Sequence, residues 1–173
     1  MILETKRLLL LPLTGRQLEL LVTDVAEFEK ETAYKYNGES LEGEMYDIIK
    51  GQIIPVQASG KDFVWHTFWM IVLKNDNTII GSVGYKDIPS SNGSVEIGYG
   101  VNREYESRGY TTEAVTAMIC WAFQQPNVLR IIAEVDKNNI ASQKILYKNG
   151  FQEFKSMDNF NWYTISKNSV NNI

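Results

Sequence analysis

The sequence predicts a single α/β domain that spans residues 1–173. Strand-like segments alternate along the chain with segments whose apolar residues recur at the helical period. No internal repeat or low-complexity tract divides the chain. At this length a compact protein buries roughly 70% of the surface that its unfolded chain exposes, which supports one core without disulfides. We therefore expect one domain in which strands and helices alternate.

The first half of the chain predicts strands and helices in alternation. Leu18, Leu21, Val22, Val25 and Phe28 recur at the helical period, and β-branched and aromatic residues mark the later strands. The expected elements are a strand over Leu3–Pro12, a helix over Gly15–Glu29, a second helix over Glu39–Gln52, and a strand hairpin formed by Phe63–Leu73, the turn Asn75–Asn77 and Thr78–Tyr85.

The second half repeats the alternation with clearer signals. Strict alternation over Ser94–Val101 indicates a strand buried on one face. A helix is expected over Thr111–Gln125 with Thr111 or Thr112 as its N-cap, followed by a strand over Leu129–Val135. A last helix begins within residues 138–142 and ends at Gly150, in the left-handed position after a helix.

Charge and cysteine content narrow the class of partner. Seventeen Lys and Arg against 21 Asp and Glu give a net charge of −4, which argues against nucleic acid or an anionic membrane and favours a cationic or amine partner. One Cys120 and one His66 cannot build a disulfide or a zinc cluster, so no metal is expected. No apolar run is long enough for a membrane span, and a cytoplasmic location is expected.

The segment from Glu106 to Tyr110 is the first candidate site. A strand that leads through a short loop with Gly109 into a helix offers unpaired N–H groups and the positive end of a helix dipole, which suits a phosphate. Taken alone, the same pattern also fits an ordinary strand-to-helix loop.

Five motifs in order resemble the GNAT superfamily of acyl-CoA-dependent N-acetyltransferases, and within it the RimJ/RimL-like branch. The resemblance spans essentially the whole chain. The motifs are Thr5-Lys6-Arg7-Leu8-Leu9-Leu10, Glu96-Ile97-Gly98-Tyr99, the loop Glu106–Thr111 followed by Thr112-Glu113-Ala114, Asn139–Ser142, and Lys148–Phe151.

The resemblance implies a mostly antiparallel seven-stranded sheet, flanked by about four helices and splayed between its fourth and fifth strands, Ser94–Val101 and Leu129–Val135. Acetyl-CoA would enter this gap as cosubstrate and acetylate a primary amine, on a protein N-terminus or a small molecule. A monomer or homodimer is expected. The cofactor contacts would come from the backbone of Gly100 and Val101, the N–H groups of Arg108, Gly109, Tyr110 and Thr111, and Asn139.

Two residues are candidates for catalysis. Glu96 lies on the strand beside the implied thioester and would take the amine proton, although a simple ion pair is an equal alternative. The family often places a Tyr where this chain has Leu146, with Tyr147 about 100° further round the helix. By resemblance to the branch, Ser142 takes the role of acid toward the CoA thiolate; its alternative is helix capping. Asn139 could likewise be only an N-cap.

Departures from the family pattern keep a second function class open. Glu106 stands where Gln or Arg is usual, and a carboxylate near a pyrophosphate is unfavourable unless it turns outward or Arg108 compensates. Thr111 stands where Gly or Ala is usual. The departures at Glu106 and Leu146 leave open, as the alternative, a non-catalytic acyl-CoA-binding sensor on the same fold. His66 is interpreted as a packed or solvated residue. Residues 34–65 carry no motif that identifies the acceptor amine.

Overall fold

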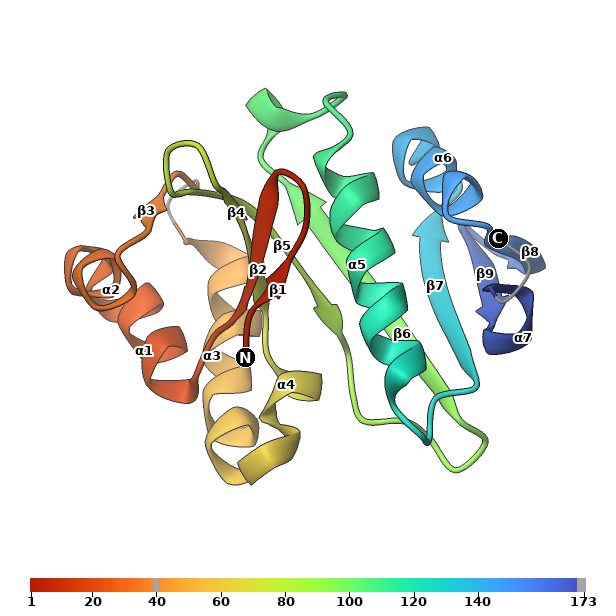
Figure 1. Ribbon diagram of the computed structural model, residues 1–173, viewed down its shortest axis with the longest axis horizontal. Coiled ribbons are helices and arrows are strands. Elements are labelled where there is room, and N and C mark those ends of the chain that lie inside the picture. Colours follow the sequence, from red (N-terminus) through yellow and green to blue (C-terminus); the bar gives the residue numbers. More distant parts are fainter. Residues whose placement is uncertain (39–40, 171–173) are drawn as a thin grey trace.

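The structure is a computed structural model that describes residues 1–38 and 41–170 (Figure 1). Its strands form one sheet, and helices cover both faces. In the described residues the strands are β1 (Leu3–Glu4), β2 (Leu8–Pro12), β3 (Lys35–Tyr36), β4 (Trp69–Leu73), β5 (Thr78–Tyr85), β6 (Ser94–Val101), β7 (Arg130–Asp136), β8 (Gln152–Met157) and β9 (Phe160–Ser166). The helices are α1 (Gly15–Thr23), α2 (Val25–Thr32), α3 (Gly43–Ala58), α4 (Phe63–His66), α5 (Tyr110–Gln124), α6 (Ile140–Lys148) and α7 (Lys167–Val170).

The strand order is β1-β2-β4-β5-β6-β7-β9-β8, and β3 pairs separately with β5. Pairing is antiparallel except between β3 and β5 and between β6 and β7. The mixed, mostly antiparallel fold class is therefore confirmed. The strands exceed the expected seven by β1 and β3, which have two residues each. The helices exceed the expected four because α4 and α7 are single turns and the first helix divides into two.

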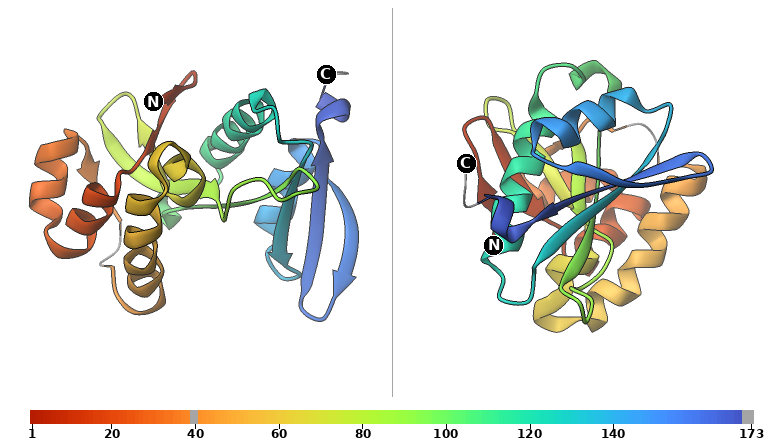
Figure 2. Two further views of the ribbon diagram at one scale, coloured as in Figure 1. Left: turned by 90° about the horizontal axis from the view of Figure 1, so that it is seen from below. Right: turned by 90° about the vertical axis from the view of Figure 1, so that its right-hand side faces the viewer.

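The parallel pairing of β6 with β7 is short, and this shapes the molecule. It covers three register positions, Ser94–Glu96 against Arg130–Ile132, after which the strands separate. The guanidinium of Arg130 donates to Ser94 Oγ at 2.9 and 3.0 Å and holds the closed end together. Figure 2 shows β7, β8 and β9 turning away from the rest of the sheet. The splay predicted between these two strands is present.

Two apolar clusters pack on opposite faces of the sheet. One lies beneath α4 and α5 and continues onto β7 and β9, and the other lies beneath α1, α2 and α3. Strand β4 is buried along its whole length because Trp69, Ile71 and Leu73 join the first cluster while Met70 and Val72 join the second. Its continuous apolar run thus reflects burial on both faces.

Three expected elements have other bounds in the structure, for local reasons. The expected first strand divides into β1 and β2 at a turn closed by the bond from Thr5 N to Leu8 O. The expected first helix divides at Asp24, whose carboxylate accepts from Glu27 N and starts α2. The expected second helix begins at Gly43 and continues to Ala58, while residues 39 and 40 lie outside the described residues.

The other differences concern one strand and one cap. Residues 63–66 form α4 instead of a strand, because Trp65 packs against Tyr85 and Trp121 and Trp69 Nε1 donates to Val64 O. A short apolar run does not by itself distinguish a helix from a strand. The N-cap of α5 is Gly109, not Thr111 or Thr112. No helix in residues 1–38 and 41–170 is long and apolar enough to cross a membrane.

Candidate active site

The diverging part of β6 presents a free backbone edge. Residues 97–101 pair with β5 on one side, where Gly100 opposes Ser82 and Val101 opposes Gly81. On the other side, register with β7 ends at Glu96 opposite Ile132. The N–H and C=O groups of an unpaired strand edge can bind an extended amide chain. Gly100 and Val101, predicted to contact a cofactor, lie on this edge.

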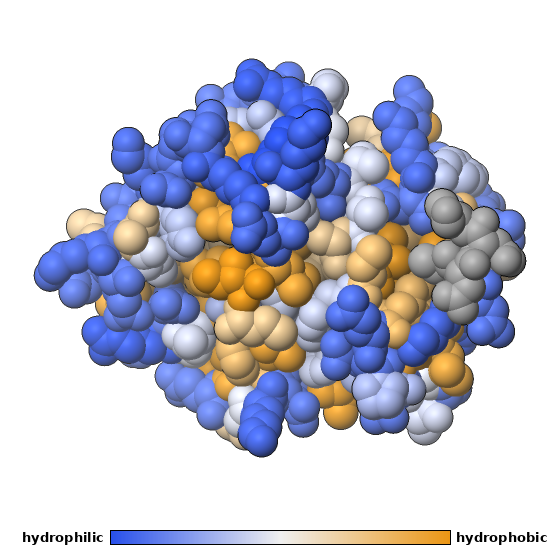
Figure 3. Space-filling view, in the orientation of Figure 1, coloured by the Kyte–Doolittle hydropathy of each residue, from blue (hydrophilic) through white to orange (hydrophobic). Residues whose placement is uncertain are grey.

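The loop before α5 ends in an open helix N-terminus. Ser107 and Gly109 both have positive φ, 60° and 78°, and Gly109 is the N-cap. No side chain caps α5, so the first N–H groups of the helix, at Tyr110 and Thr111, are not used by a capping oxygen. Left-handed residues in such a loop turn successive N–H groups toward one point, which favours an anion. Figure 3 shows hydrophilic residues over this loop and over α6, with less hydrophilic residues between them.

Hydrogen bonds from Thr5 and Arg7 to Glu113 and to the carbonyl oxygen of Arg108 hold this loop in place, and we refer to them as the brace. Arg7 Nε donates to Glu113 Oε2 at 2.6 Å, and its Nη1 donates to the carbonyl oxygen of Arg108 at 3.0 Å. The guanidinium also lies over the Tyr110 ring, 4.5 Å from its centre. Thr5 Oγ1 donates to Glu113 Oε1 at 2.7 Å. The first and third sequence motifs therefore meet as one structural unit.

Glu113 is held in its ionised form. Burial of the carboxyl group opposes ionisation, but donors from Thr5 and from the backbone and side chain of Arg7 outweigh it and lower the pKa of Glu113 below its usual value. The first turn of α5 thus carries a carboxylate at the positive end of the helix dipole, which is the favourable arrangement.

Across the gap, Ser142 and Tyr99 connect α6 to β6. Ser142 Oγ donates to Tyr99 Oη at 3.0 Å, and Tyr99 Oη donates to the Ser142 carbonyl at 3.2 Å. Asn139 Oδ1 accepts from Ser142 N at 3.0 Å and caps α6. Asn139 therefore has the capping geometry, and the Ser142 hydroxyl is bonded to a side chain of β6.

Tyr99 was missed as a site residue by the sequence analysis. Its alternation with Val95 and Ile97 marks it as a core residue, and only the fold brings its hydroxyl to Ser142. Burial raises the pKa of Tyr99, and the hydrogen bond with Ser142 partly offsets this effect. The phenol is therefore protonated at neutral pH and able to donate.

The position where the family often has Tyr is not part of the gap. Leu146 is fully buried in the core. Tyr147 is half exposed and packs edge-on against Tyr163 of β9, with ring centres 5.5 Å apart. Among these aromatic hydroxyls, Tyr99 is the one that bonds to Ser142.

Glu96 lies at the vertex of the splay, where register between β6 and β7 ends. Its carboxylate forms an ion pair with Lys86, and its Oε1 is shielded from solvent. Its neighbours Val95 and Ile97 are buried in the core, so Glu96 is on the opposite face as alternation predicts. The ion-pair alternative considered for Glu96 is thus present in the structure.

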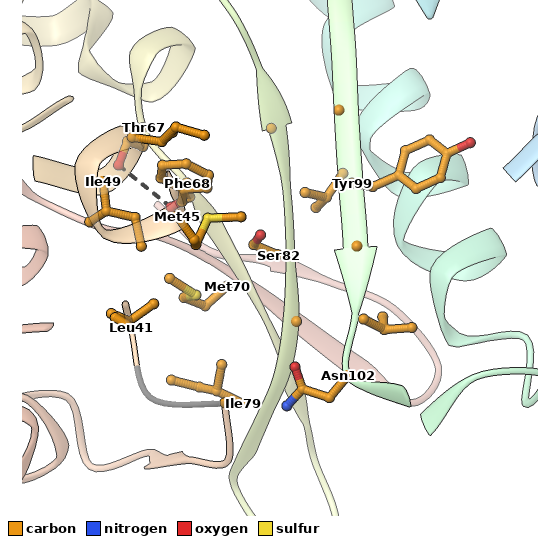
Figure 4. A pocket seen from close by; sticks show the side chains of 18 of the residues that line it. Leu41, Met45, Ile49, Thr67, Phe68, Met70, Ile79, Ser82, Tyr99 and Asn102 are labelled. Carbon is orange, nitrogen blue, oxygen red and sulfur yellow. Dashed lines mark hydrogen bonds between the residues drawn. The ribbon is translucent and has the colours of Figure 1, made fainter. Parts of the chain in front are cut away.

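A cavity of about 890 Å³ opens on the face of β5 and β6 that carries Gly98 and Gly100 (Figure 4). Leu41, Met45 and Ile49 lie on one side of it, and in Figure 4 Tyr99 points away from it toward α5. Glu96 lines a small recess next to this cavity, and Lys86 lines both the recess and the cavity.

His66 also lines the cavity, with Nδ1 3.5 Å from Asp87 Oδ1. The interpretation of His66 as a packed or solvated residue stays a prediction. Glu106 is exposed and lines the same cavity. Within the described residues, no three His, Cys, Asp or Glu side chains converge on a possible metal position.

The splayed sheet, free strand edge and open helix N-terminus define an acyl-transferase class of fold. Residues 7–152 match the family described as Acetyltransferase (GNAT) domain. The chain belongs to the GNAT acetyltransferase family and is an acetyltransferase enzyme.

Relatives agree along the whole chain. The N-acetyltransferase YjdG of Bacillus subtilis (strain 168) is 32% identical over 169 residues, which cover 96% of this chain and 99% of that protein. YoaA of the same organism, also described as an N-acetyltransferase, is 28% identical and covers 88% of this chain and 83% of its own.

Solved structures show the same fold at low identity. A ribosomal-protein-S5-alanine acetyltransferase from Vibrio fischeri has a TM-score of 0.71 and 18% identity, covering 96% of this chain and 97% of that chain. The ribosomal L7/L12 alpha-N-protein acetyltransferase RimL, solved with coenzyme A, has a TM-score of 0.69 and 16% identity, covering 96% and 98%. At this identity the two neighbours show that the fold is shared.

Proposed function

We propose that the protein transfers the acetyl group of acetyl-CoA to a primary amine by direct attack of the amine on the thioester. The observation that carries the proposal is the free edge of β6 beside the uncapped N-terminus of α5. An amide-containing chain that ends in phosphates needs both features together, one for its amides and one for its charge.

The cofactor contacts follow from these two features. The backbone of Gly100 and Val101 would pair with the pantetheine arm. The N–H groups of Arg108, Gly109, Tyr110 and Thr111 would hold the pyrophosphate, helped by the Arg108 side chain. Asn139 would act by holding the first turn of α6 and its Ser142 beside the gap.

The amine must lose a proton before it attacks, since an ammonium has no free electron pair. We assign this role to Glu96, acting through water from the vertex of the splay. Lys86 forms an ion pair with this carboxylate and holds it in place. The amine nitrogen forms the bond to the acetyl carbon, and the electron pair of the broken C–S bond leaves on sulfur.

The departing thiolate needs a proton or a hydrogen bond. We assign it to Ser142, whose hydroxyl is bonded to the protonated phenol of Tyr99. In the structure Ser142 Oγ donates to Tyr99 Oη, so the Ser142 hydroxyl has to turn toward the thiolate before it donates. Tyr99 Oη can then donate to Ser142 Oγ in its place. This pair takes the place of the Tyr that other family members carry where this chain has Leu146.

An assay of free thiol with acetyl-CoA and a panel of amines tests the proposal. Acetyl transfer releases CoA thiol in proportion to acetylated amine. A sensor would bind CoA in calorimetry and release no thiol above the rate without amine, and that result would overturn the proposed function. A cytoplasmic location and a monomer or homodimer belong to the same proposal.

A further inference from the structure

The floor of the 890 Å³ cavity is almost free of side chains. Ser82 lies opposite Gly100 and Gly84 lies opposite Gly98 in the antiparallel register of β5 and β6. Cross-strand partners share a face of a sheet, so these four residues form one continuous patch. We refer to Ser82, Gly84, Gly98 and Gly100 as the bare floor.

The bare floor keeps space open above the sheet. A Cβ atom built on Gly98 or Gly100 would meet no atom within 4 Å, so packing does not require glycine there. Gly84 differs, because its Cβ would lie 2.9 Å from the Thr67 carbonyl oxygen. Two of the three glycines therefore leave room for a ligand instead of relieving a clash.

The wall that faces the bare floor is apolar. Met45, Ile48 and Ile49 of α3 recur at helical spacing and line the cavity. Met45 is 49% exposed and Ile48 is 43% exposed, so both keep apolar surface in water that a ligand could cover. Figure 4 shows Phe68, Met70 and Ile79 gathered on the same side of the cavity.

Two polar side chains of the wall are bonded to the protein itself. Thr67 Oγ1 donates to Leu13 O at 2.6 Å, and Asn102 donates to Asn37 O. They are therefore less available to the amides of a bound peptide. Moving an amide out of water without a new hydrogen-bond partner costs free energy, which disfavours a peptide in this cavity.

Charge at the rim is compatible with an ammonium group. Glu42 and Glu106 line the cavity together with Arg103 and Lys86, and Lys86 is already paired with Glu96. The lining thus has two carboxylates against two cations, and the ion pair with Glu96 offsets the charge of one of these cations, Lys86.

We propose that the acceptor is a small primary amine carried by an apolar aryl or alkyl group, which lies on the bare floor against α3 while its amine points toward the splay. This inference rests on the proposed function and specifies its substrate. The cavity has the size of a small-molecule site, which typically spans about 300–1,000 Å³.

Thiol release from acetyl-CoA is measured with linear amines from propylamine to hexylamine, with phenethylamine, and with peptides that begin with Ala or Ser. Each added methylene should raise kcat/KM about threefold to fourfold until the cavity is filled. Phenethylamine should exceed both peptides by at least about tenfold.

Two outcomes separate the inference from the function it rests on. Equal rates across the alkyl series, or faster turnover of the peptides, would overturn the apolar acceptor and leave acetyl transfer intact. Absence of thiol release from every amine, with CoA still bound in calorimetry, would overturn the proposed function and the inference with it.

Variants test the placement on the bare floor. Gly98→Leu should lower kcat/KM for phenethylamine at least about tenfold while the Kd of CoA stays within about twofold. The matched control is Gly51→Leu, since Gly51 also has no atom within 4 Å of its Cβ position but does not line the cavity. Unchanged phenethylamine kinetics in folded Gly98→Leu would contradict the placement.

A second variant makes one exposed residue of the apolar wall polar. Because this residue lies on α3, the test does not require strand β6 to accept a larger side chain. Ile48→Gln should reduce the ratio of hexylamine to propylamine turnover at least about threefold. An unchanged ratio would also overturn the inference.

Discussion

Arg7 and Glu113 are 106 positions apart in the sequence, and the backbone N and Nε of Arg7 donate to the two carboxylate oxygens of Glu113 at 2.8 and 2.6 Å. The same guanidinium reaches the carbonyl oxygen of Arg108 in the loop before α5. The turn between β1 and β2 is therefore fastened to the element proposed to hold the pyrophosphate.

Glu113→Gln should lower the free energy of unfolding by about 1–2 kcal/mol at neutral pH, because charged hydrogen bonds are lost from a partly exposed site. The pKa of Glu113 is lowered in the folded state, so the difference in free energy of unfolding between wild type and variant is complete above pH 4.5, the usual pKa of the group. The difference disappears as the pH falls through the lowered pKa of the folded state. Urea unfolding from pH 7 to pH 3 checks this, and a constant difference at all pH values would contradict it.

Arg7→Met should weaken CoA binding about threefold to tenfold, because the loop carbonyl of Arg108 loses its support. Arg16→Met is the control, since Arg16 forms an exposed ion pair with Glu31 at 2.7 Å, away from the loop. Calorimetric titration with CoA compares the two variants. Equal affinities would mean that the brace serves folding alone.

Gly109→Val should raise the Kd of CoA at least tenfold, about 1.4 kcal/mol, because φ of +78° disfavours a branched side chain and the Cβ blocks close approach of the phosphates. Gly60→Val is matched to it, with φ of +54° and open space outside the site. If both folded variants bind CoA like the wild type, the pyrophosphate is held elsewhere.

Glu106→Gln should tighten CoA binding if the exposed carboxylate faces the pyrophosphate, and should leave it unchanged if the carboxylate faces solvent. The exposed Glu19 on α1 supplies the control, Glu19→Gln, for the loss of one negative charge. Titration at low and high salt measures both. A marked loss of affinity in Glu106→Gln alone would show that the carboxylate supports the loop.

Ser142→Ala should lower kcat by roughly 10- to 100-fold with little change in the Kd of CoA, because one transition-state hydrogen bond is lost. Tyr99→Phe should have a smaller effect, and the double variant should lose little more than Ser142→Ala, since the two hydroxyls act as a unit. Additive losses would mean that Tyr99 only packs.

Glu96→Gln should lower kcat/KM most at low pH and recover partly as pH rises, because a larger fraction of the amine is then already neutral. His66→Asn is the comparison, since His66 lines the cavity beside Asp87. Steady-state rates from pH 6 to pH 9 decide between them. The larger low-pH loss in His66→Asn would transfer the role of proton acceptor to the imidazole.

Local signals predicted the elements that carry strong periodicity. The alternation in Ser94–Val101 and the period of the helix after Gly109 are set by neighbours in sequence, and both elements appear. The single turn over Phe63–His66 was not predictable, because its helical form depends on Trp65 packing against Trp121 of a distant helix.

Some residues of the candidate site also have a local signal in the sequence, and others do not. The loop around Gly109 has a local signal, since a positive φ and a helix start leave their mark within a few residues. The contact of Tyr99 with Ser142 leaves no such mark, because the two residues lie 43 positions apart and meet across the gap. The ion pair of Glu96 with Lys86 likewise depends on tertiary structure, since Lys86 N donates to Glu96 O at 2.9 Å just beyond the last register pair of β5 and β6.

The sequence by itself determined the class of fold, the position of the phosphate-type loop and the resemblance to the acetyltransferase family, because these depend on periodicity, turn residues and ordered motifs. The tertiary structure alone decided where β6 and β7 separate, which side chains brace the loop, and how the bare floor faces α3. Those features arise from contacts between residues far apart in the chain, whose geometry is fixed only when the sheet twists and the helices pack on it.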